Sequence, residues 1–287
     1  MGLFARGGTT PVVLSSVMGI ASLLIATFVD PVMHLVTLTG VLCLMFSAFL
    51  ANFFRDPDRP VPKDVGVLVS PADGHVMFVV REHSTGRRPS KMELESGECE
   101  NDSLTGDWFP EPLSTPLSFD TEQRWEKVVV GQESNEDVWR VAVFMSPLDV
   151  HVNRVPEAGT IIKMEHRTGK GRRKGPFLPA FKKESEYNER VRTQFKSDNG
   201  EVLEITQISG ALARTIIPWK REGDVLRRGE RYGMIRVGSR VDLRVPAAIY
   251  EPMVIGADSK NPSYPKGQFV SAAVSILFRS INSAEEE

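Results

Sequence analysis

Residues 229–246 read G-E-R-Y-G-M-I-R-V-G-S-R-V-D-L-R-V-P, and the rest of the chain is arranged around this segment. The mainly apolar run 234–237 precedes Gly238 and Ser239, and the run 241–245, which alternates strictly between apolar and charged side chains, follows them. Such alternation predicts half-buried strands, and the Gly-Ser step predicts a turn or bulge between them. Glycine tolerates strained backbone, and the following hydroxyl can lie against the glycine carbonyl. Most Gly-Ser steps are ordinary turns, so the pair does not by itself indicate chemistry.

Further strand patterns precede and follow this segment. They lie at residues 67–69, 76–80, 138–145, 202–208, 211–217, 247–255 and 269–278. Residues 223–229 have the spacing Gly-Asp-x-x-x-x-Gly, which is similar to the tight turns of lipoyl- and biotinyl-carrier domains and bears on the fold alone. These patterns predict a mainly β domain, a compact β-sandwich or hybrid barrel, over residues 56–287.

The N-terminal part of the chain is apolar and shows no strand pattern. Residues 11–29 and 32–54 contain no charged side chain, and an Asp-Pro step separates the two runs. Thr10 followed by Pro11 predicts a helix start. As helices, the runs would extend about 28 Å and about 34 Å, against a hydrocarbon core of ~30 Å. We therefore predict a transmembrane helical hairpin over residues 1–55. A buried hairpin in a soluble protein is the alternative, and a signal peptide fits less well because a second apolar run follows.

The basic residues beside the hairpin predict its orientation. Arg6 precedes the two runs, whereas Arg55, Arg59 and Lys63 follow them, and the turn between the runs has no Lys or Arg. Because basic residues favour the cytoplasmic side, we expect both ends of the hairpin and the β domain to lie in the cytoplasm, at the cell membrane.

The net charge of −2 conceals an uneven distribution. Residues 93–137 carry 13 acidic and 2 basic residues, so the remainder of the chain has a net charge of +9. A basic body suits an anionic lipid surface or nucleic acid, but the sequence has no nucleic-acid recognition motif. We interpret residues 82–137 as an acidic inserted loop. The two cysteines, Cys43 and Cys99, indicate neither a disulfide framework nor a metal cluster.

Several ordered motifs together resemble one enzyme family. They are F-F-R-D-P at 53–57, S-P-A-D-G at 70–74, F-M-S-P-L-D-V-H-V-N-R at 144–154, F-L-P-A-F at 177–181, N-E-R at 188–190, Q-I-S-G at 207–210, and the segment from residue 229. In this order they resemble the short, archaeal- and bacterial-type phosphatidylserine decarboxylases. The set covers most of the chain and is far more specific than any single motif.

The resemblance implies a pyruvoyl enzyme that makes its cofactor from its own serine. Ser239 would attack the carbonyl of Gly238, the chain would divide between residues 238 and 239, and a pyruvoyl group would remain at the start of the 239–287 chain. The ketone of that group would form a Schiff base with the amine of an anionic aminophospholipid, phosphatidylserine or archaetidylserine. The lipid would lose CO2 to give the ethanolamine lipid, and the two chains would stay associated.

The resemblance also implies roles for other residues. Asp73 matches the aspartate that supports self-processing, and His151 is the candidate acid/base that returns a proton to the substrate. Longer members carry a second histidine where this chain has Arg154, so His151 could serve both reactions or another group could assist. Lys170, Arg172 and Arg173 lie in a basic run that either contacts lipid phosphate or is a solvated loop.

Two other functions remain open from the sequence. The first is a membrane-anchored hydrolase that uses Ser239, His151 and Asp73, although the serine lies within a strand pattern and no G-x-S-x-G elbow surrounds it. The second is a non-catalytic carrier or adaptor, although no modifiable lysine follows the expected hairpin apex. We expect no bound metal and no nucleic-acid partner, and we expect that the chain could form a homo-oligomer.

Overall fold

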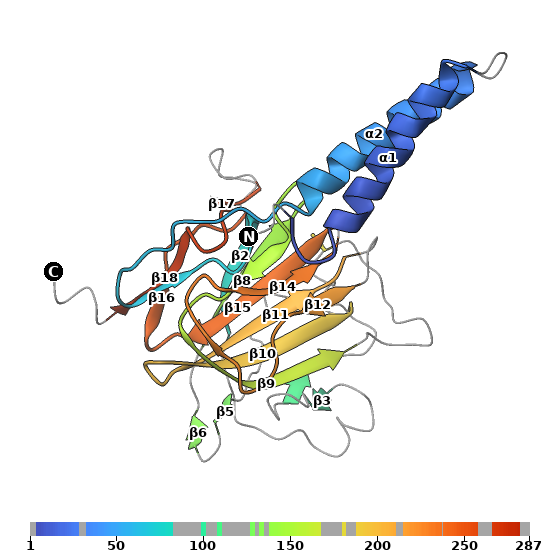
Figure 1. Ribbon diagram of the computed structural model, residues 1–287. Helices are drawn as coiled ribbons and strands as arrows, with labels where there is room; N and C mark the ends of the chain where they lie inside the picture. The colour runs from blue at the N-terminus through green and yellow to red at the C-terminus, as the bar shows by residue number, and fades with distance from the viewer. Residues whose placement is uncertain are drawn as a thin grey trace. The chain divides into compact units, whose positions relative to one another are not determined.

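The computed structural model describes residues 4–28, 33–82, 99–101, 108–110, 127–129, 132–134, 138–167, 180–181, 188–210, 215–236, 238–257 and 266–281 (Figure 1). The chain forms two compact units. The first comprises Met1–Asp58 together with Pro147–Val152, and the second comprises Arg59–Ser146 together with Asn153–Glu287.

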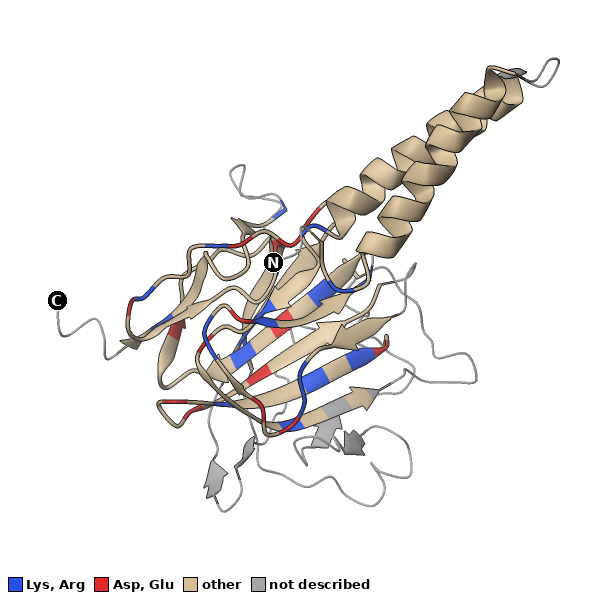
Figure 2. Cartoon of the chain, in the orientation of Figure 1, with Lys and Arg blue, Asp and Glu red and all other residues tan. Residues whose placement is uncertain are grey.

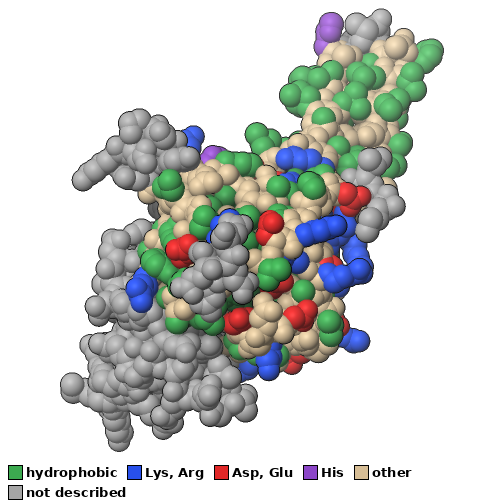
Figure 3. All heavy atoms as spheres, turned by 90° about the vertical axis from the view of Figure 1, so that its left-hand side faces the viewer, with side chains coloured by type: hydrophobic (Ala, Val, Ile, Leu, Met, Phe, Trp, Pro, Cys, Tyr) green, Lys and Arg blue, Asp and Glu red, His purple; other side chains and the backbone are tan. Residues whose placement is uncertain are grey.

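The first unit is built on two antiparallel helices, α1 (Thr9–Ala26) and α2 (Met33–Phe53). Both are long and apolar enough to cross a membrane, and their side chains are mostly exposed, as the hydrophobic spheres over the hairpin in Figure 3 show. The helices approach closely where two glycines meet: a Cβ on Gly19 would lie 3.1 Å from the carbonyl oxygen of Gly40. The helix begins at Thr9, beside the predicted start, but the expectation that Thr10 caps it is wrong, because Gly8 is the N-cap residue and makes no side-chain hydrogen bond.

The second unit is mainly β, as predicted. Its largest sheet has eight antiparallel strands in the order β13-β9-β10-β11-β15-β7-β2-β17. Two three-stranded sheets have the orders β1-β18-β16 and β12-β14-β8, and two strand pairs are β3-β4 and β5-β6. The strands are β1 (Val67–Val69), β2 (Gly74–Glu82), β3 (Cys99–Asn101), β4 (Trp108–Pro110), β5 (Lys127–Val129), β6 (Gln132–Ser134), β7 (Val138–Met145), β8 (Val152–Arg154), β9 (Gly159–Arg167), β10 (Arg190–Ser197), β11 (Val202–Ile208), β12 (Ile216–Pro218), β13 (Val225–Leu226), β14 (Arg231–Ile235), β15 (Ser239–Pro246), β16 (Tyr250–Pro252), β17 (Phe269–Val270) and β18 (Ile276–Ser280).

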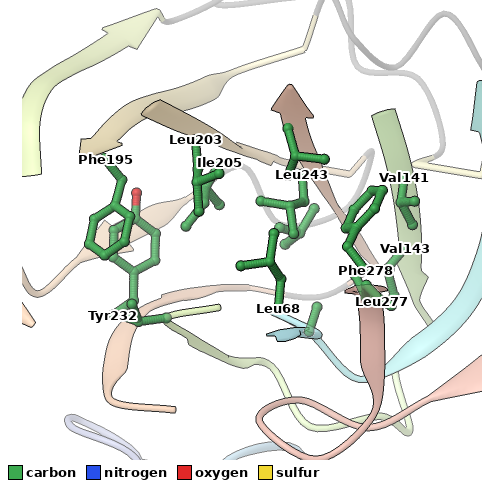
Figure 4. Packing of buried hydrophobic residues seen from close by; sticks show 14 of the residues in the cluster. Leu68, Val141, Val143, Phe195, Leu203, Ile205, Tyr232, Leu243, Leu277 and Phe278 are labelled. Carbon is green, nitrogen blue, oxygen red and sulfur yellow. The ribbon is translucent and has the colours of Figure 1, made fainter. Parts of the chain in front are cut away.

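The core lies between the large sheet and the smaller ones. Side chains of the large sheet, among them Leu203, Ile205 and Leu243, face side chains of β1, β14 and β18, namely Leu68, Tyr232, Leu277 and Phe278 (Figure 4). Because side chains alternate along a strand, Val241, Leu243 and Val245 of β15 point into this core and the even-numbered residues point to the opposite face.

That opposite face carries buried charges, visible as coloured bands on the strands in Figure 2. Asp242 accepts hydrogen bonds from Arg140 of β7 and from Arg240, and all three side chains are fully buried. The guanidinium carbons of Arg140 and Arg240 lie 5.5 Å and 4.9 Å from the centre of the Phe78 ring. Glu204 of β11 pairs in the same way with Arg192 and Arg244. The ladder around β15 is therefore held by ion pairs as well as by backbone hydrogen bonds.

Some predicted strands are shorter or divided. The strand predicted over residues 269–278 is two strands, because a turn at 272–274 interrupts it and Ala273 adopts a φ of 61°. Tertiary hydrogen bonds hold this turn: the amide of Ala272 donates to Asp73, and that of Ala273 donates to the carbonyl of Ser70. Of residues 247–255 only β16 is extended, and residues 211–214 lie outside the described part of the chain. Within the predicted loop 82–137, the described residues include the short strands β3 to β6.

Candidate active site

Ser239 is the first residue of β15 and follows a glycine in a left-handed conformation. Gly238 has a φ of +66°, and among the described residues other than its chain neighbours no heavy atom lies within 4 Å of the position that a Cβ would take there. Glycine occupies this conformation at little cost, whereas other residues are strained by it. The positive φ agrees with the predicted turn between the two strands. The carbonyl of Gly238 lies directly before β15, which pairs with β11 on one side and with β7 on the other.

The Ser239 side chain is fully buried and points to the core face. Its cross-strand neighbour on β7 is Met145, a core residue, and Val241 of the same face pairs with Gln207 of β11. Within the described part of the chain, the Ser239 Oγ atom has no hydrogen-bond partner. A buried hydroxyl without a partner is rare because it costs free energy. Ser239 is therefore a candidate for chemistry rather than for stability.

Asp73 is also buried, but its carboxylate is already engaged. Oδ2 accepts a hydrogen bond from Nη2 of Arg59 at 2.6 Å, and Oδ1 accepts one from the amide of Ala272 at 2.7 Å. The next residue, Gly74, packs on the backbone of β7: an added Cβ would lie 2.0 Å from the carbonyl oxygen of Phe144. Because β7 separates β2 from β15, Asp73 lies about two strand spacings, or ~10 Å, from Ser239. The structure therefore assigns Asp73 no direct contact with the serine.

His151 belongs to the first unit. Its Nδ1 donates to the carbonyl oxygen of Asp149 at 2.8 Å, so Nε2 is the acceptor of the neutral ring. Burial lowers the pKa of His151 to about 4, and the backbone hydrogen bond to Asp149 offsets only part of this shift. Nε2 is buried and has no hydrogen-bond partner among the described residues. The centre of the His151 ring lies 4.4 Å from that of the Phe53 ring. Because of its lowered pKa, His151 is neutral at physiological pH.

The other predicted site residues differ in how they are placed. Arg154, at the position of the second histidine, is buried and donates to the carbonyl oxygen of Gly229 at 3.2 Å, which ties β8 to the turn before β14. Lys170, Arg172 and Arg173 lie outside the described residues. Among the residues that are described, no group of three or more His, Cys, Asp or Glu side chains could hold a metal ion.

The sequence assigned no role to a second set of buried polar groups on the core face. Gln207 donates through Nε2 to Oδ1 of Asn153 at 2.8 Å, and Nδ2 of Asn153 contacts the sulfur of Met145 at 3.6 Å. The Gln207 Oε1 and Ser209 Oγ atoms are buried without a hydrogen-bond partner in the described chain. The only sequence signal for this cluster is the motif at residues 207–210, which carries no chemical meaning by itself.

This geometry permits an intramolecular reaction more readily than a hydrolytic relay. A serine that follows its own target carbonyl needs no encounter with a second molecule, and such orientation can lower a barrier by roughly 7–11 kcal/mol. A Ser-His-Asp relay would require Asp73 to orient the base, but both its oxygens are engaged by Arg59 and Ala272. These hydrogen bonds of Asp73 therefore argue against a Ser-His-Asp hydrolase.

Comparison with known proteins identifies similar sequences over most of the chain. A family model described as phosphatidylserine decarboxylase matches residues 46–276. A Streptomyces coelicolor protein named phosphatidylserine decarboxylase proenzyme is 50% identical over 210 residues, which cover 73% of this chain and 68% of the relative. A Granulibacter bethesdensis protein of the same name is 35% identical over 232 residues, with coverage of 80% and 72%. A Methanopyrus kandleri protein provisionally named an archaetidylserine decarboxylase proenzyme is 37% identical over 215 residues, with coverage of 75% and 78%.

Proposed function

The chain belongs to the phosphatidylserine decarboxylase family of carboxy-lyases, and from that premise we propose that it activates itself by cleavage between Gly238 and Ser239. The mature protein would then decarboxylate a serine phospholipid, phosphatidylserine or archaetidylserine, to the ethanolamine lipid. The single observation that carries the proposal is the buried hydroxyl of Ser239, which follows a left-handed glycine and has no hydrogen-bond partner among the described residues.

In the first step, Oγ of Ser239 attacks the carbonyl carbon of Gly238. The C–Oγ bond forms, the peptide C–N bond breaks, and the hydroxyl proton ends on the released nitrogen, which leaves an ester. Residue 239 then loses its α-proton while the Cβ–Oγ bond breaks, so that Gly238 leaves as a carboxylate and residue 239 becomes dehydroalanine. Hydrolysis of this residue, with loss of ammonia, gives the pyruvoyl end.

The surroundings of residue 239 fit such a group. β15 lies between β11 and β7, and β18 pairs with β1, so residues 239–287 stay bound through backbone ladders after the cut. The ion pairs of Asp242 hold the new chain end three residues from the cut. When formed, the pyruvoyl group supplies a carbonyl that withdraws electrons from the substrate as CO2 leaves.

The remaining roles follow from residue chemistry. His151, neutral because of its lowered pKa, accepts a proton and returns one to the α-carbon of the substrate. Asp73 acts indirectly, because Arg59 and Ala272 fix it beside the Gly74–Phe144 contact and thereby support the strand next to Ser239. The apolar hairpin anchors the enzyme in the membrane with the β domain in the cytoplasm, and Lys170, Arg172 and Arg173 bind the lipid phosphate.

Intact-mass spectrometry of the purified full-length protein tests the cleavage. The wild type should give two polypeptides that correspond to residues 1–238 and 239–287, with a carbonyl that borohydride reduces. Ser239→Ala should give one polypeptide without activity. Ser197→Ala replaces another buried serine, whose hydroxyl donates to Glu201, and should be cleaved like the wild type.

The outcomes separate the candidate functions. A Ser239→Ala chain that still divides at this position would show that the nucleophile is wrong. An undivided wild type that reacts with a fluorophosphonate probe would favour the hydrolase. Release of CO2 from vesicles that contain ester-linked or ether-linked serine lipid would then define the substrate.

A further inference from the structure

Three buried oxygen atoms without partners lie on the core face around residue 239. They are Oγ of Ser239, Oε1 of Gln207 and Oγ of Ser209, and none has a hydrogen-bond partner in the described chain. All three residues are completely inaccessible to solvent. Most polar atoms buried this deeply have a partner, which is often an ordered water when no protein group is near. Three such atoms in one place indicate a site for a small polar molecule.

The strand register brings the three residues together. Gln207 of β11 pairs with Val241 of β15, and Ile208, the last residue of β11, pairs with Arg240. We infer, by continuing this register one position beyond β11, that Ser209 lies opposite Ser239. Residues directly opposite on antiparallel strands have Cβ atoms about 4.5–5.5 Å apart, and diagonal neighbours such as Gln207 and Ser239 are within reach of long side chains. The odd-numbered residues of both strands face the core, so the three side chains share one face.

Two contacts fix how these groups are presented. The Gln207 amide donates Nε2 to Asn153, so its carbonyl oxygen is the atom left without a partner. The backbone of Ser209 is held on both sides, because its amide donates to the carbonyl of Glu189 and its carbonyl accepts from the Asn188 side chain. The site therefore offers one oxygen that can only accept and two hydroxyls that can accept or donate.

We propose that Gln207, Ser209 and Ser239 hold one buried water molecule, and that this water completes the formation of the pyruvoyl group. Buried waters make about three hydrogen bonds to otherwise unsatisfied groups, and in the uncleaved precursor the cluster supplies three. Once the Ser239 oxygen has left with Gly238, Gln207 and Ser209 keep the water in place. The water donates one hydrogen bond to Gln207 Oε1 and one to Ser209 Oγ. This orientation turns the lone pairs of the water oxygen toward the α-carbon of residue 239. Gln207 and Ser209 are thus positioning residues for self-processing.

The step that this water serves is balanced. After elimination, residue 239 carries an amino group on a C=C bond, which tautomerises to an imine with a methyl group. The water oxygen forms a bond to the α-carbon, the C–N bond breaks, and both water protons end on the departing nitrogen, which leaves as ammonia. Because the site is closed to solvent, a held water reaches this carbon more readily than a bulk one.

This inference rests on the proposed self-cleavage, and the experiment separates the two. Gln207→Met and Ser209→Ala each remove one contact to the water, and they are compared with Gln194→Met, which alters another buried glutamine of the same sheet. Intact mass gives the rate at which the 239–287 chain forms, and a hydrazide reagent gives the rate at which its carbonyl forms. We expect Gln207→Met to lower carbonyl formation per cleaved chain by about fivefold, the effect of one lost hydrogen bond. Ser209→Ala should lower it less, and Gln194→Met should not change it.

The readouts give a decision in each case. If the wild type is not cleaved, the proposed function fails. If the wild type is cleaved but Gln207→Met shows an unchanged ratio of carbonyl to cleaved chain, the water proposal alone is overturned. Should the variants fail to fold, a high-resolution crystal structure of the Ser239→Ala precursor decides, because a water must lie within hydrogen-bond distance of both Gln207 Oε1 and Ser209 Oγ. An empty or apolar site there would overturn the proposal.

Discussion

The two faces of β15 bury polar groups in opposite ways. On one face, Asp242 is surrounded by Arg140 and Arg240 and accepts hydrogen bonds from both. On the other face, Ser239 has no partner among the described residues, and Gln207 beside it keeps one unsatisfied oxygen. Both arrangements are fully buried, but only the paired one stabilises the fold, because an unpaired polar group costs free energy when it leaves water. Under the proposed function, this difference separates the polar residues that stabilise the fold from those that take part in self-processing.

The largest expected effect comes from breaking the paired face. Burial alone would raise the pKa of Asp242, but the charges of Arg140 and Arg240 outweigh it and lower the pKa to about 2. Asp242→Asn would leave two buried guanidinium groups without their counter-charge, and removal of one partner of a buried ion pair costs about 3–5 kcal/mol. We expect a loss of this size in the free energy of unfolding, measured in detergent on the Ser239→Ala background so that a single chain unfolds.

A control for this prediction uses a pair that remains partly exposed. Lys220 and Glu230 form an ion pair whose side chains are 22% and 31% exposed. Glu230→Gln should cost roughly 0–1 kcal/mol, as surface ion pairs do. Equal losses for Asp242→Asn and Glu230→Gln would contradict the view that the buried pairs on β15 are structural.

The next effect concerns pH and His151, another buried residue with an atom that has no partner in the part of the chain that the structure describes. Its pKa is about 4 in the folded protein and 6.5 as a free side chain, so the unfolded chain binds more protons between these values. The free energy of unfolding should therefore be highest above pH 6.5. It should fall by about 2–4 kcal/mol as the pH falls toward 4, because His151 takes up a proton in the unfolded chain but stays neutral in the folded one. The stabilisation from ionised Asp242 should be lost only below about pH 4, as the pH falls from its ordinary pKa of 3.8 to its value of about 2 in the folded protein.

Unfolding of the Ser239→Ala precursor at a series of pH values measures this difference. His151→Gln should flatten the pH dependence between 6.5 and 4. An unaltered slope in His151→Gln would show that other groups titrate in this range.

Local patterns predicted some strands and missed others. The strands at 138–145 and 202–208 have the predicted bounds. No strand was predicted for β9 or β10, which are part of the same sheet. The predicted strand at 269–278 failed because Asp73, almost two hundred residues earlier, binds the amide of Ala272 and holds a turn there. Local β propensity is weak beside such tertiary hydrogen bonds.

The candidate site was predictable only where one short segment carries it. Gly238 and Ser239 are adjacent, so the sequence and the family resemblance could indicate them together. Arg59 as the partner of Asp73 and Asn153 as the partner of Gln207 could not be predicted, because folding alone brings these pairs together. That Ser239 has no partner among the described residues is likewise a property of packing, which no sequence pattern contains.

A smaller effect should separate the conformation of Gly238 from its chemistry. Alanine at residue 238 meets no neighbouring atom, so the cost arises from the φ of +66° alone and should be about 1–2 kcal/mol. The protein should fold but be cleaved more slowly, as intact mass over time would show. Gly200→Ala, at a φ of +98° and also in open space, should have a similar stability cost and normal cleavage. Normal cleavage of Gly238→Ala would mean that this conformation does not assist the reaction.

The smallest effect sharpens the comparison of paired with unpaired hydroxyls in one core. Tyr232 and Thr193 are buried and hydrogen-bonded to each other, so Tyr232→Phe leaves the Thr193 hydroxyl without that partner and should cost about 1–2 kcal/mol. Ser209→Ala removes a hydroxyl that has no protein partner in the described chain, and the proposed water keeps its contact to Gln207, so the same measurement of unfolding should change by no more than about 0.5 kcal/mol. A loss in Ser209→Ala as large as that in Tyr232→Phe would show that Ser209 belongs with the stabilising groups. The contrast between the two faces of β15 would then no longer identify the residues that serve the reaction.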